Sequence, residues 1–412
     1  MGFRSWYGRI SLANKILIAM VLGAIIGYIV GPGITVLDPI GTIFLRLLKM
    51  VILPLVFFSI ASGASSVVDL SRLKKIGGIF LVYWILSSLA AATIGLFWAS
   101  VIKPGVGVKL AEKAAEKAGQ VNLLESFINW IPDNVAAAFA NFNMIQVIVF
   151  SVFSGLTAAA LGETEAGKFL RNLFKSGDEL MMKMVGYIME FAPFGVFALM
   201  ANITGTAGTI VIGALAKMLV TQYVAYATIL LLVYPVFLAV FAKVNPVQHF
   251  KNIFPAMVVA FSTCSSSATL PVTMESVKKR AGVPEDIVNL IAPPAATINM
   301  HAVAAEMPIY ALFAAQIFGV ELSPSSLVSI IVLGVVMAAG VAGVPGGAIM
   351  MASVLMNIMG LPMTIIPWIA GIYRLIDMPN TMLNVTGDTV GMVTVASLMG
   401  ELDRKTFEES KK

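Results

Sequence analysis

The chain has 412 residues, of which 58% are hydrophobic and only 12% are charged. Soluble domains carry about a quarter charged residues, so this composition excludes an ordinary soluble globular protein. The formal net charge of +5 does not indicate nucleic-acid binding, because the basic residues cluster at the ends of apolar segments. The predicted fold class is an all-α polytopic membrane protein.

A series of apolar segments follows along the chain, and a bilayer is spanned by about 20 such residues. The candidate spans are residues 16–30, 43–60, 79–99, 145–161, 181–200, 210–241, 291–318, 327–359 and 362–399. They are expected to form one integrated bundle.

Basic residues gather in alternate connections between these segments. They are Arg4, Arg9 and Lys15, then Arg72, Lys74 and Lys75, then Lys168, Arg171 and Lys175, then Lys243 and Lys251, then Lys278, Lys279 and Arg280, and last Arg404 and Lys405. The positive-inside rule places these connections and both termini in the cytoplasm, in a multi-pass protein of the cell (inner) membrane. The loop over residues 103–120 is the exception, because it is predicted to lie outside and still carries lysines.

Two segments satisfy this alternation only if each enters and leaves the membrane on the same side. Residues 262–271 read STCSSSATLP, and residues 340–347 read GVAGVPGG, both typical of the tip of a hairpin. Broken backbone at membrane depth survives only where it is buried in protein or lines a cavity. Two such breaks point to the binding site of a secondary transporter.

The last apolar segment carries a polar stripe. Asp377, Thr381, Asn384 and Asp388 stand at i, i+4, i+7 and i+11, which is one face of a helix. Carboxylates inside a membrane are costly, so the stripe is expected to face a substrate or cation path. Asp377 is interpreted as an anchor for a substrate ammonium, against snorkelling at an interface. Asp388 with Asn384 is interpreted as a hard-cation site, against a hydrogen-bonded packing pair.

Other polar residues leave alternatives open. His301, near Asn299 in the segment 291–318, is either a satisfied packing residue or a proton carrier. Glu306 lies about 140° around the helix from His301, so the two need not touch, and snorkelling near the outer end is one interpretation of its position. Arg374 either forms an i, i+3 ion pair with Asp377 or supplies a cation to the pocket.

No motif indicates an enzyme or a cofactor. The chain has two histidines, His249 and His301, and no His-Glu-x-x-His, Gly-x-Ser-x-Gly or phosphate-loop pattern. Cys264 is the single cysteine, so an intrachain disulfide is impossible. The expected partners are a small-molecule amino acid and the lipid bilayer, with no nucleic acid.

Four motifs together resemble the glutamate transporter homologues, the dicarboxylate/amino acid:cation symporter family, along nearly the whole chain. They are SSSATLP at 265–271, ATINM at 296–300, GVPG at 343–346 and NVTGD at 384–388. The resemblance implies eight transmembrane helices, two re-entrant helical hairpins, and a homotrimer in which a mobile domain moves like an elevator against a scaffold.

The same resemblance implies a division of the chain. Residues 1–75 would be scaffold helices 1–2, and residues 103–206 the outer loop with scaffold helices 4–5. Residues 76–102 would be helix 3 of the transport domain, and residues 207–412 its helix 6, hairpin 1, helix 7, hairpin 2 and helix 8.

The chain departs from the family at two implied sodium sites. His301 replaces an acid that helps to bind one sodium, and Trp84 stands where a tyrosine is usual, although Ser87 and Ser88 could still contribute hydroxyls. In a second site Ala338 and Val341 replace hydroxyl residues.

Further implied metal ligands survive. Thr297 remains at the second site, and the oxygen-bearing core of a third site is kept by Asn299, Asn384 and Asp388. With two sites weakened, His301 is predicted to take part in coupling, so that protons replace some sodium or coupling rests on the Asp388 site alone.

The implied substrate pocket is also altered. Asp377 resembles the anchor of the α-amino group, whereas Asn380 stands where carriers of acidic amino acids have an arginine. Asparagine cannot supply the bidentate charged fork that a carboxylate prefers. The predicted substrate-binding residues are Ser265, Ser266, Val303, Val344, Pro345, Gly346, Asp377, Asn380, Thr381 and Asn384.

These observations predict secondary active, cation-coupled (Na⁺ and/or H⁺) uptake of a small amino acid with a neutral side chain. One alternative is a symporter of acidic amino acids or dicarboxylates that uses Arg374. The other is a passive channel or a ligand-binding homologue, suggested by the altered cation sites.

Overall fold

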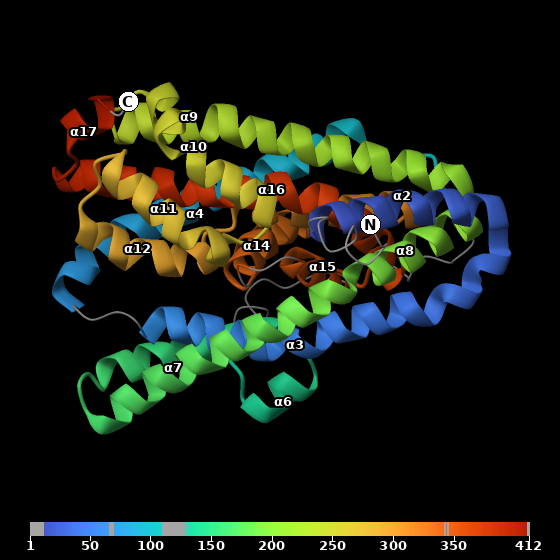
Figure 1. The fold of residues 1–412 in the computed structure, drawn as a ribbon, viewed down its shortest axis with the longest axis horizontal. Coiled ribbons are helices and arrows are strands. Elements are labelled where there is room, and N and C mark those ends of the chain that lie inside the picture. The colour runs from blue at the N-terminus through green and yellow to red at the C-terminus, as the bar shows by residue number, and fades with distance from the viewer. Residues whose placement is uncertain are drawn as a thin grey trace, which may run out of the picture.

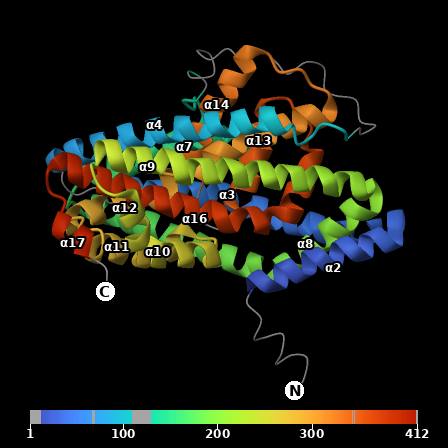
Figure 2. The ribbon, with the colours of Figure 1, turned by 90° about the horizontal axis from the view of Figure 1, so that it is seen from above.

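The computed structural model describes residues 12–65, 70–108, 128, 130–341, 343 and 346–409. Within these ranges every regular element is a helix, and the long helices run along one common axis (Figure 1). A second view, turned by 90°, shows the same lengthwise arrangement (Figure 2). The predicted all-α class is therefore confirmed for the described part of the chain.

The first half of the chain supplies one group of helices. It comprises α2 (Leu12–Val30), η1 (Gly31–Leu37), α3 (Asp38–Ser65), α4 (Leu70–Ile102), α6 (Val135–Ala140), α7 (Met144–Ala160) and α8 (Glu165–Thr228). The second half comprises η2 (Ile229–Val233), α9 (Tyr234–Val236), η3 (Phe237–Phe241), α10 (Pro246–Thr263), α11 (Ser266–Lys279), α12 (Glu285–Ile298), α13 (His301–Phe318), α14 (Pro324–Ala339), α15 (Gly347–Ile358), η4 (Met363–Ile365), α16 (Ile366–Met399) and α17 (Arg404–Glu409).

Helix α8 has 64 residues, far more than a single crossing of a bilayer requires. Its backbone leaves helical geometry at Gly208, where φ is +68°, a value that glycine adopts at little cost. Figure 1 shows the chain of α8 reversing its direction at the right-hand end of the molecule. The predicted spans 181–200 and 210–241 thus lie on either side of a kink, which falls beside the predicted boundary between residues 206 and 207.

Length and composition support membrane insertion. Five helical stretches within the described residues are long and apolar enough to cross a membrane: Asn14–Ser65, Lys75–Ile102, Glu165–Thr206, Ile210–Phe241 and Glu285–Phe318. Shorter apolar helices are Gln146–Ala160, Pro324–Ala339 and Gly347–Ile358. Large apolar side chains such as Ile29 and Leu231 are more than 70% exposed, which suits contact with lipid.

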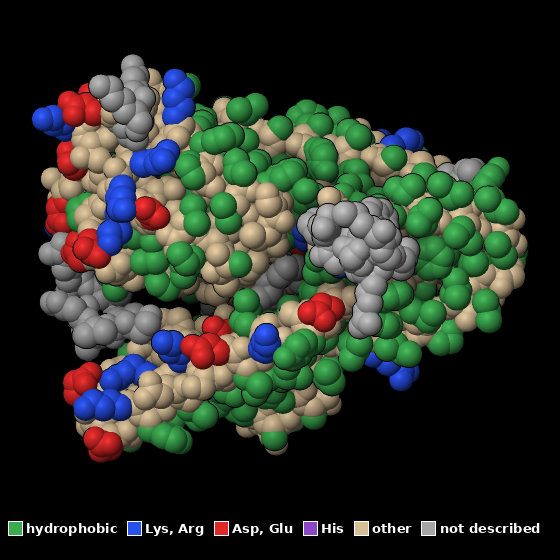
Figure 3. Space-filling view, in the orientation of Figure 1, with side chains coloured by type: hydrophobic (Ala, Val, Ile, Leu, Met, Phe, Trp, Pro, Cys, Tyr) green, Lys and Arg blue, Asp and Glu red, His purple; other side chains and the backbone are tan. Residues whose placement is uncertain are grey.

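Charged side chains gather at one end of the molecule, on the left in Figure 3, whereas hydrophobic side chains cover its length. At that end the Arg404 guanidinium donates to the carbonyl of Lys243 at 2.8 Å, and the amide of Asp403 donates to the carbonyl of Gly282 at 2.9 Å. Three connections that the sequence places on one side of the membrane therefore lie together.

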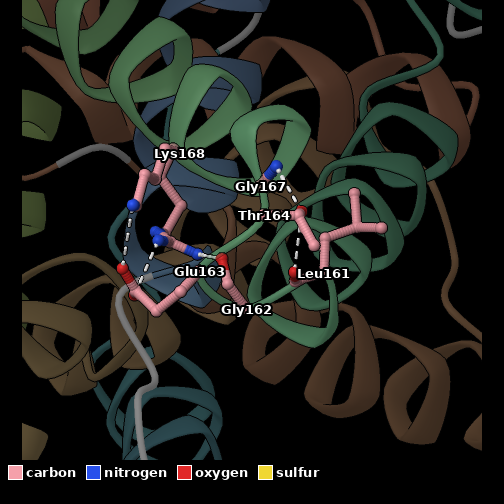
Figure 4. A network of polar contacts seen from close by, with 7 residues as sticks. Leu161, Gly162, Glu163, Thr164, Gly167 and Lys168 are labelled. Atoms are coloured by element: carbon pink, nitrogen blue, oxygen red, sulfur yellow. Dashed lines mark hydrogen bonds and ion pairs between the residues drawn. The ribbon is translucent and has the colours of Figure 1, made fainter.

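The turn between α7 and α8 lies at the same end (Figure 1). Figure 4 shows its polar contacts at close range. Thr164 caps α8 by accepting a hydrogen bond from the amide of Gly167 at 3.1 Å. Arg171 and Lys168 lie 3.1 Å and 3.6 Å from the Glu163 carboxylate. Because Glu163 is 80% exposed, each of these ion pairs contributes at most about 1 kcal/mol to stability. The positive charges of Lys168 and Arg171 matter more for the topology, because basic residues favour the cytoplasmic side.

Candidate functional site

The two predicted tips meet. The first joins α10 to α11, where Cys264 adopts a left-handed φ of +55° and the Ser265 hydroxyl caps α11 by accepting from the amide of Ala268. The second joins α14 to α15 around Gly343. The Ser265 hydroxyl donates to the Gly343 carbonyl at 2.9 Å, and the amide of Ser267 donates to the same oxygen at 3.2 Å.

A small chamber lies between these tips and α16. It has a volume of about 10 Å³, roughly the space of one water molecule, so it is too small to hold an amino acid in this arrangement. Six of the predicted substrate-binding residues line it: Ser266, Val303, Asp377, Asn380, Thr381 and Asn384. The predicted Ser265 and Gly346 lie at the tips, and Val344 and Pro345 fall outside the described residues. An amino acid can enter only if a tip moves.

Asp377 is the one acidic residue among those that line the chamber, and its side chain is buried. It accepts hydrogen bonds at 3.4 Å from the amide of Gly346 and from the hydroxyl of Thr381. The ion pair with Arg374, considered from the sequence, is not formed, because the guanidinium turns to the carbonyl of Ser262 at 3.3 Å. The Asp377 carboxylate therefore faces the second tip and the chamber.

The segment 291–318, predicted as one continuous span, is interrupted. Helix α12 ends at Ile298 and α13 begins at His301, while Asn299 and Met300 have ψ values of 60° and 71°, outside the helical range. This break carries the side chain of Asn299 to α16, where its amide donates to Asp388 at 2.8 Å.

Asn299 and Asp388 make the most suitable cation site among the residues predicted to bind metal. Both side chains are buried, and the Asn299 Oδ1 atom has no hydrogen-bond partner within the described part of the chain. An unsatisfied buried amide oxygen beside a carboxylate fits a hard cation such as Na⁺. The described residues contain no group of three or more His, Cys, Asp and Glu side chains that could hold a metal, so a transition-metal site is not indicated there.

The other predicted metal ligands lie apart or are already bonded. The Thr297 hydroxyl donates to the carbonyl of Pro294 at 2.9 Å, and Ser87 Oγ lies 2.7 Å from His301 Nε2. The Ser88 hydroxyl is buried without a partner among the described residues. The Asn384 amide oxygen accepts from the amide of Ala302 at 2.8 Å and keeps a second lone pair, so its predicted place beside Asp388 at the third site stays a prediction.

His301 is enclosed by protein. Its Nδ1 atom lies 2.9 Å from the hydroxyl of Tyr234, which donates to the carbonyl of Leu383 at 2.9 Å. The Tyr83 ring stands edge-on to the imidazole, with centroids 5.9 Å apart. Of the two interpretations left open by the sequence, this geometry provides every partner that a packing histidine needs, and its role in coupling stays a prediction.

Glu306 does not snorkel at the outer end, because its side chain is fully buried. It accepts hydrogen bonds from Tyr226, from Asn380 and, at 3.3 Å, from Tyr310. Sequence analysis missed this cluster, because Tyr226 and Asn380 are 80 and 74 residues away along the chain and no local pattern connects them.

A membrane-embedded helical bundle in which two breaks between helices meet beside a buried carboxylate is typical of a secondary transporter. Residues 12–398 match the sequence profile of the Sodium:dicarboxylate symporter family. The chain belongs to this family, and is therefore a symporter-type transporter that uses coupling ions rather than an enzyme or a cofactor-dependent protein.

Relatives match over nearly their full length. The proton/sodium-glutamate symport protein of Bacillus caldotenax is 32% identical, with 96% of each chain covered. The proton/glutamate-aspartate symporter of Escherichia coli (strain K12) is 28% identical, with 96% of this chain and 95% of the relative covered. The C4-dicarboxylate transport protein of Bacillus subtilis (strain 168) is 29% identical, with 95% and 94% covered. These names agree better with the acidic or dicarboxylate alternative than with the predicted neutral amino acid.

Proposed function

We propose that the chain carries a small amino acid into the cell by symport with Na⁺ or H⁺. The observation that supports this most strongly is the chamber beside the two tips, which touch at Gly343, with the buried Asp377 among the residues that line it. A buried carboxylate is costly in a membrane protein and is well placed to bind a substrate ammonium.

Coupling is proposed to use the Asn299–Asp388 site. The free Asn299 Oδ1 atom and the Asp388 carboxylate offer oxygens to a cation about two helical turns from Thr381 along α16. Binding of the cation on the side of α16 that holds the chamber would favour the arrangement that binds substrate. Linkage then requires each ligand to raise the affinity for the other.

This proposal also includes the division into scaffold and transport domains, the eight-helix topology, the trimer and the elevator movement. The kink at Gly208 lies beside the proposed boundary, and the clustering of Lys243, Gly282 and Arg404 at one end supports cytoplasmic termini.

A second candidate is uptake of an acidic amino acid or dicarboxylate. The names of the relatives favour it, and so does one feature of Arg374. Its Nε atom is buried without a hydrogen-bond partner among the described residues, and it lines a cavity of about 30 Å³ together with Asp377. A substrate carboxylate could satisfy this N–H group.

Uptake into proteoliposomes separates the two candidates. The panel contains serine, alanine, aspartate, succinate and lysine, each tested with an inward Na⁺ gradient, an inward H⁺ gradient and neither. The proposal expects serine or alanine to accumulate under at least one gradient. Accumulation of aspartate or succinate alone would establish the second candidate, and equilibration without accumulation would support a passive channel.

A further inference from the structure

One fully buried carboxylate lies just behind the wall of the chamber. Glu306 belongs to α13 and does not line the chamber, whereas Asn380, which donates to its Oε1 atom, does. Tyr226 donates to the same oxygen and Tyr310 donates to Oε2 at 3.3 Å. Three donors converge on one carboxyl group, an arrangement that suits the ionised form, which only accepts.

A backbone group fixes the orientation of the connecting amides. The amide of Ala302 can only donate, so the Asn384 atom 2.8 Å from it is the carbonyl oxygen. The other end of Asn384 is then the NH₂ group, which donates to the Asn380 oxygen at 2.7 Å. Asn380 consequently directs its own NH₂ group toward Glu306, and this direction does not rest on an arbitrary amide assignment.

This chain of bonds governs what the chamber can accept. Asn380 gives one N–H to Glu306 and its oxygen to Asn384, so it offers a substrate carboxylate only one neutral N–H. The carboxyl group of Glu306, whose three donors favour its ionised form, lies directly behind it. The wall also contains the apolar residues Met300, Val303 and Val341, which disfavour a charge of either sign on the substrate side chain.

We propose that Glu306 is a specificity-determining residue that acts through Asn380 and excludes from the chamber amino acids with a negatively charged side chain. Glu306 also would neutralise any arginine introduced at position 380. This inference rests on the proposed function, because it assigns the substrate class of the same chamber.

The test combines Asn380→Arg, Glu306→Gln, the double variant and the unchanged protein. Glutamine keeps the size of the side chain and one oxygen that can accept from Asn380 and Tyr226, while its NH₂ group takes the place of the oxygen that accepts from Tyr310, whose hydroxyl can accept instead. Affinity for serine and for aspartate is measured on the purified full chain by ligand-induced thermal stabilisation, which does not require transport. Glu306→Asp serves as the control that keeps the charge.

The unchanged protein is expected to bind serine more tightly than aspartate. Glu306→Gln should raise the ratio of aspartate to serine affinity about 10- to 100-fold, the effect of a unit charge one side chain away at an effective dielectric of about 20. Glu306→Asp should leave that ratio near its original value. Asn380→Arg alone should gain little aspartate affinity, and the double variant should gain much more.

Three results would overturn the inference. Glu306→Gln could change both affinities by the same factor or change neither, which would make the residue purely structural. Asn380→Arg could bind aspartate as tightly as the double variant does. The unchanged protein could prefer aspartate to serine. The failure of the carrier function can be told apart from the failure of this inference. If the affinity ratio shifts as expected but the protein accumulates no amino acid in liposomes, the carrier function is rejected and this inference stands.

Discussion

Helix α16 approaches His301 so closely that only glycine fits at position 387. A Cβ atom on Gly387 would lie 2.3 Å from His301 Nδ1 and 2.7 Å from the Tyr234 hydroxyl. Ordinary contact begins at 3.4 Å, so the imidazole would have to recede by about 1 Å in a fully buried site. Gly387→Ala is therefore expected to destabilise the protein by displacing His301 from Ser87 and Tyr234.

The magnitude follows from two effects. Overpacking a well-packed interior costs about 1–3 kcal/mol. Separating one buried hydrogen-bond partner adds about 1–3 kcal/mol. The expected loss in free energy of unfolding is about 2–6 kcal/mol, or a fall in Tm of about 2–7 °C when the average unfolding entropy per residue is scaled to this chain length.

The assay is thermal unfolding of the purified protein in detergent, with Gly213→Ala as the matched control. Gly213 is a helical, exposed glycine of α8 with nothing within 4 Å of its added Cβ, so its variant should match or slightly exceed the unchanged Tm. A double variant with His301→Ala should recover part of the loss, since the clash is then removed. A Gly387→Ala protein as stable as the control would show that α16 does not rest against the imidazole.

Three further predictions follow from the site. In Gly343→Ala the added Cβ atom would lie 2.5 Å from the Ala296 carbonyl oxygen, so the two tips should separate. Uptake into proteoliposomes should fall at least tenfold, while Tm should change by less than in Gly387→Ala. Unchanged uptake would contradict the tip contact. Asp388→Asn keeps the shape and removes the charge, so the cation concentration needed for half-maximal uptake should rise at least tenfold; an unchanged cation dependence would exclude this site. Hydrogen bonds from Thr406 lower the pKa of Asp403, so the ionised side chain stabilises the folded protein above the ordinary pKa of an aspartate, and this stabilisation is lost as pH falls through the lowered pKa. The Tm of the unchanged protein should therefore exceed that of Asp403→Ala by less at pH 3 than at pH 6. A difference that stays constant would contradict this.

Much of the site was accessible from the sequence because it depends on helical periodicity and on tip composition. Asp377, Thr381 and Asn384 share one face of a single helix, and any helix would bring them to one side. The serine run and the Gly-Val-Pro-Gly segment contain residues that favour bends. The contact between Ser265 and Gly343, however, joins residues 78 positions apart and needed the structure.

The interruption at Asn299 was not predicted. Pro293 and Pro294 do not mark it, because α12 continues past both prolines to Ile298 and the hydrogen bonds they lack are to carbonyls four residues before them. Hydropathy gives no sign of the break, because the surrounding residues are apolar. The position of Glu306 was inaccessible for a different reason: helix geometry fixes its direction on α13 but cannot say that Tyr226 of α8 and Asn380 of α16 meet it there.

The central claim is that ion binding drives accumulation of a small amino acid through the chamber. The most direct measurement is the ratio of internal to external serine in proteoliposomes, first with an imposed Na⁺ or H⁺ gradient and then after an ionophore dissipates it. The account predicts a ratio well above one that falls to one when the driving gradient is removed. A ratio that stays at one under every gradient, for serine and for all other members of the panel, would contradict it.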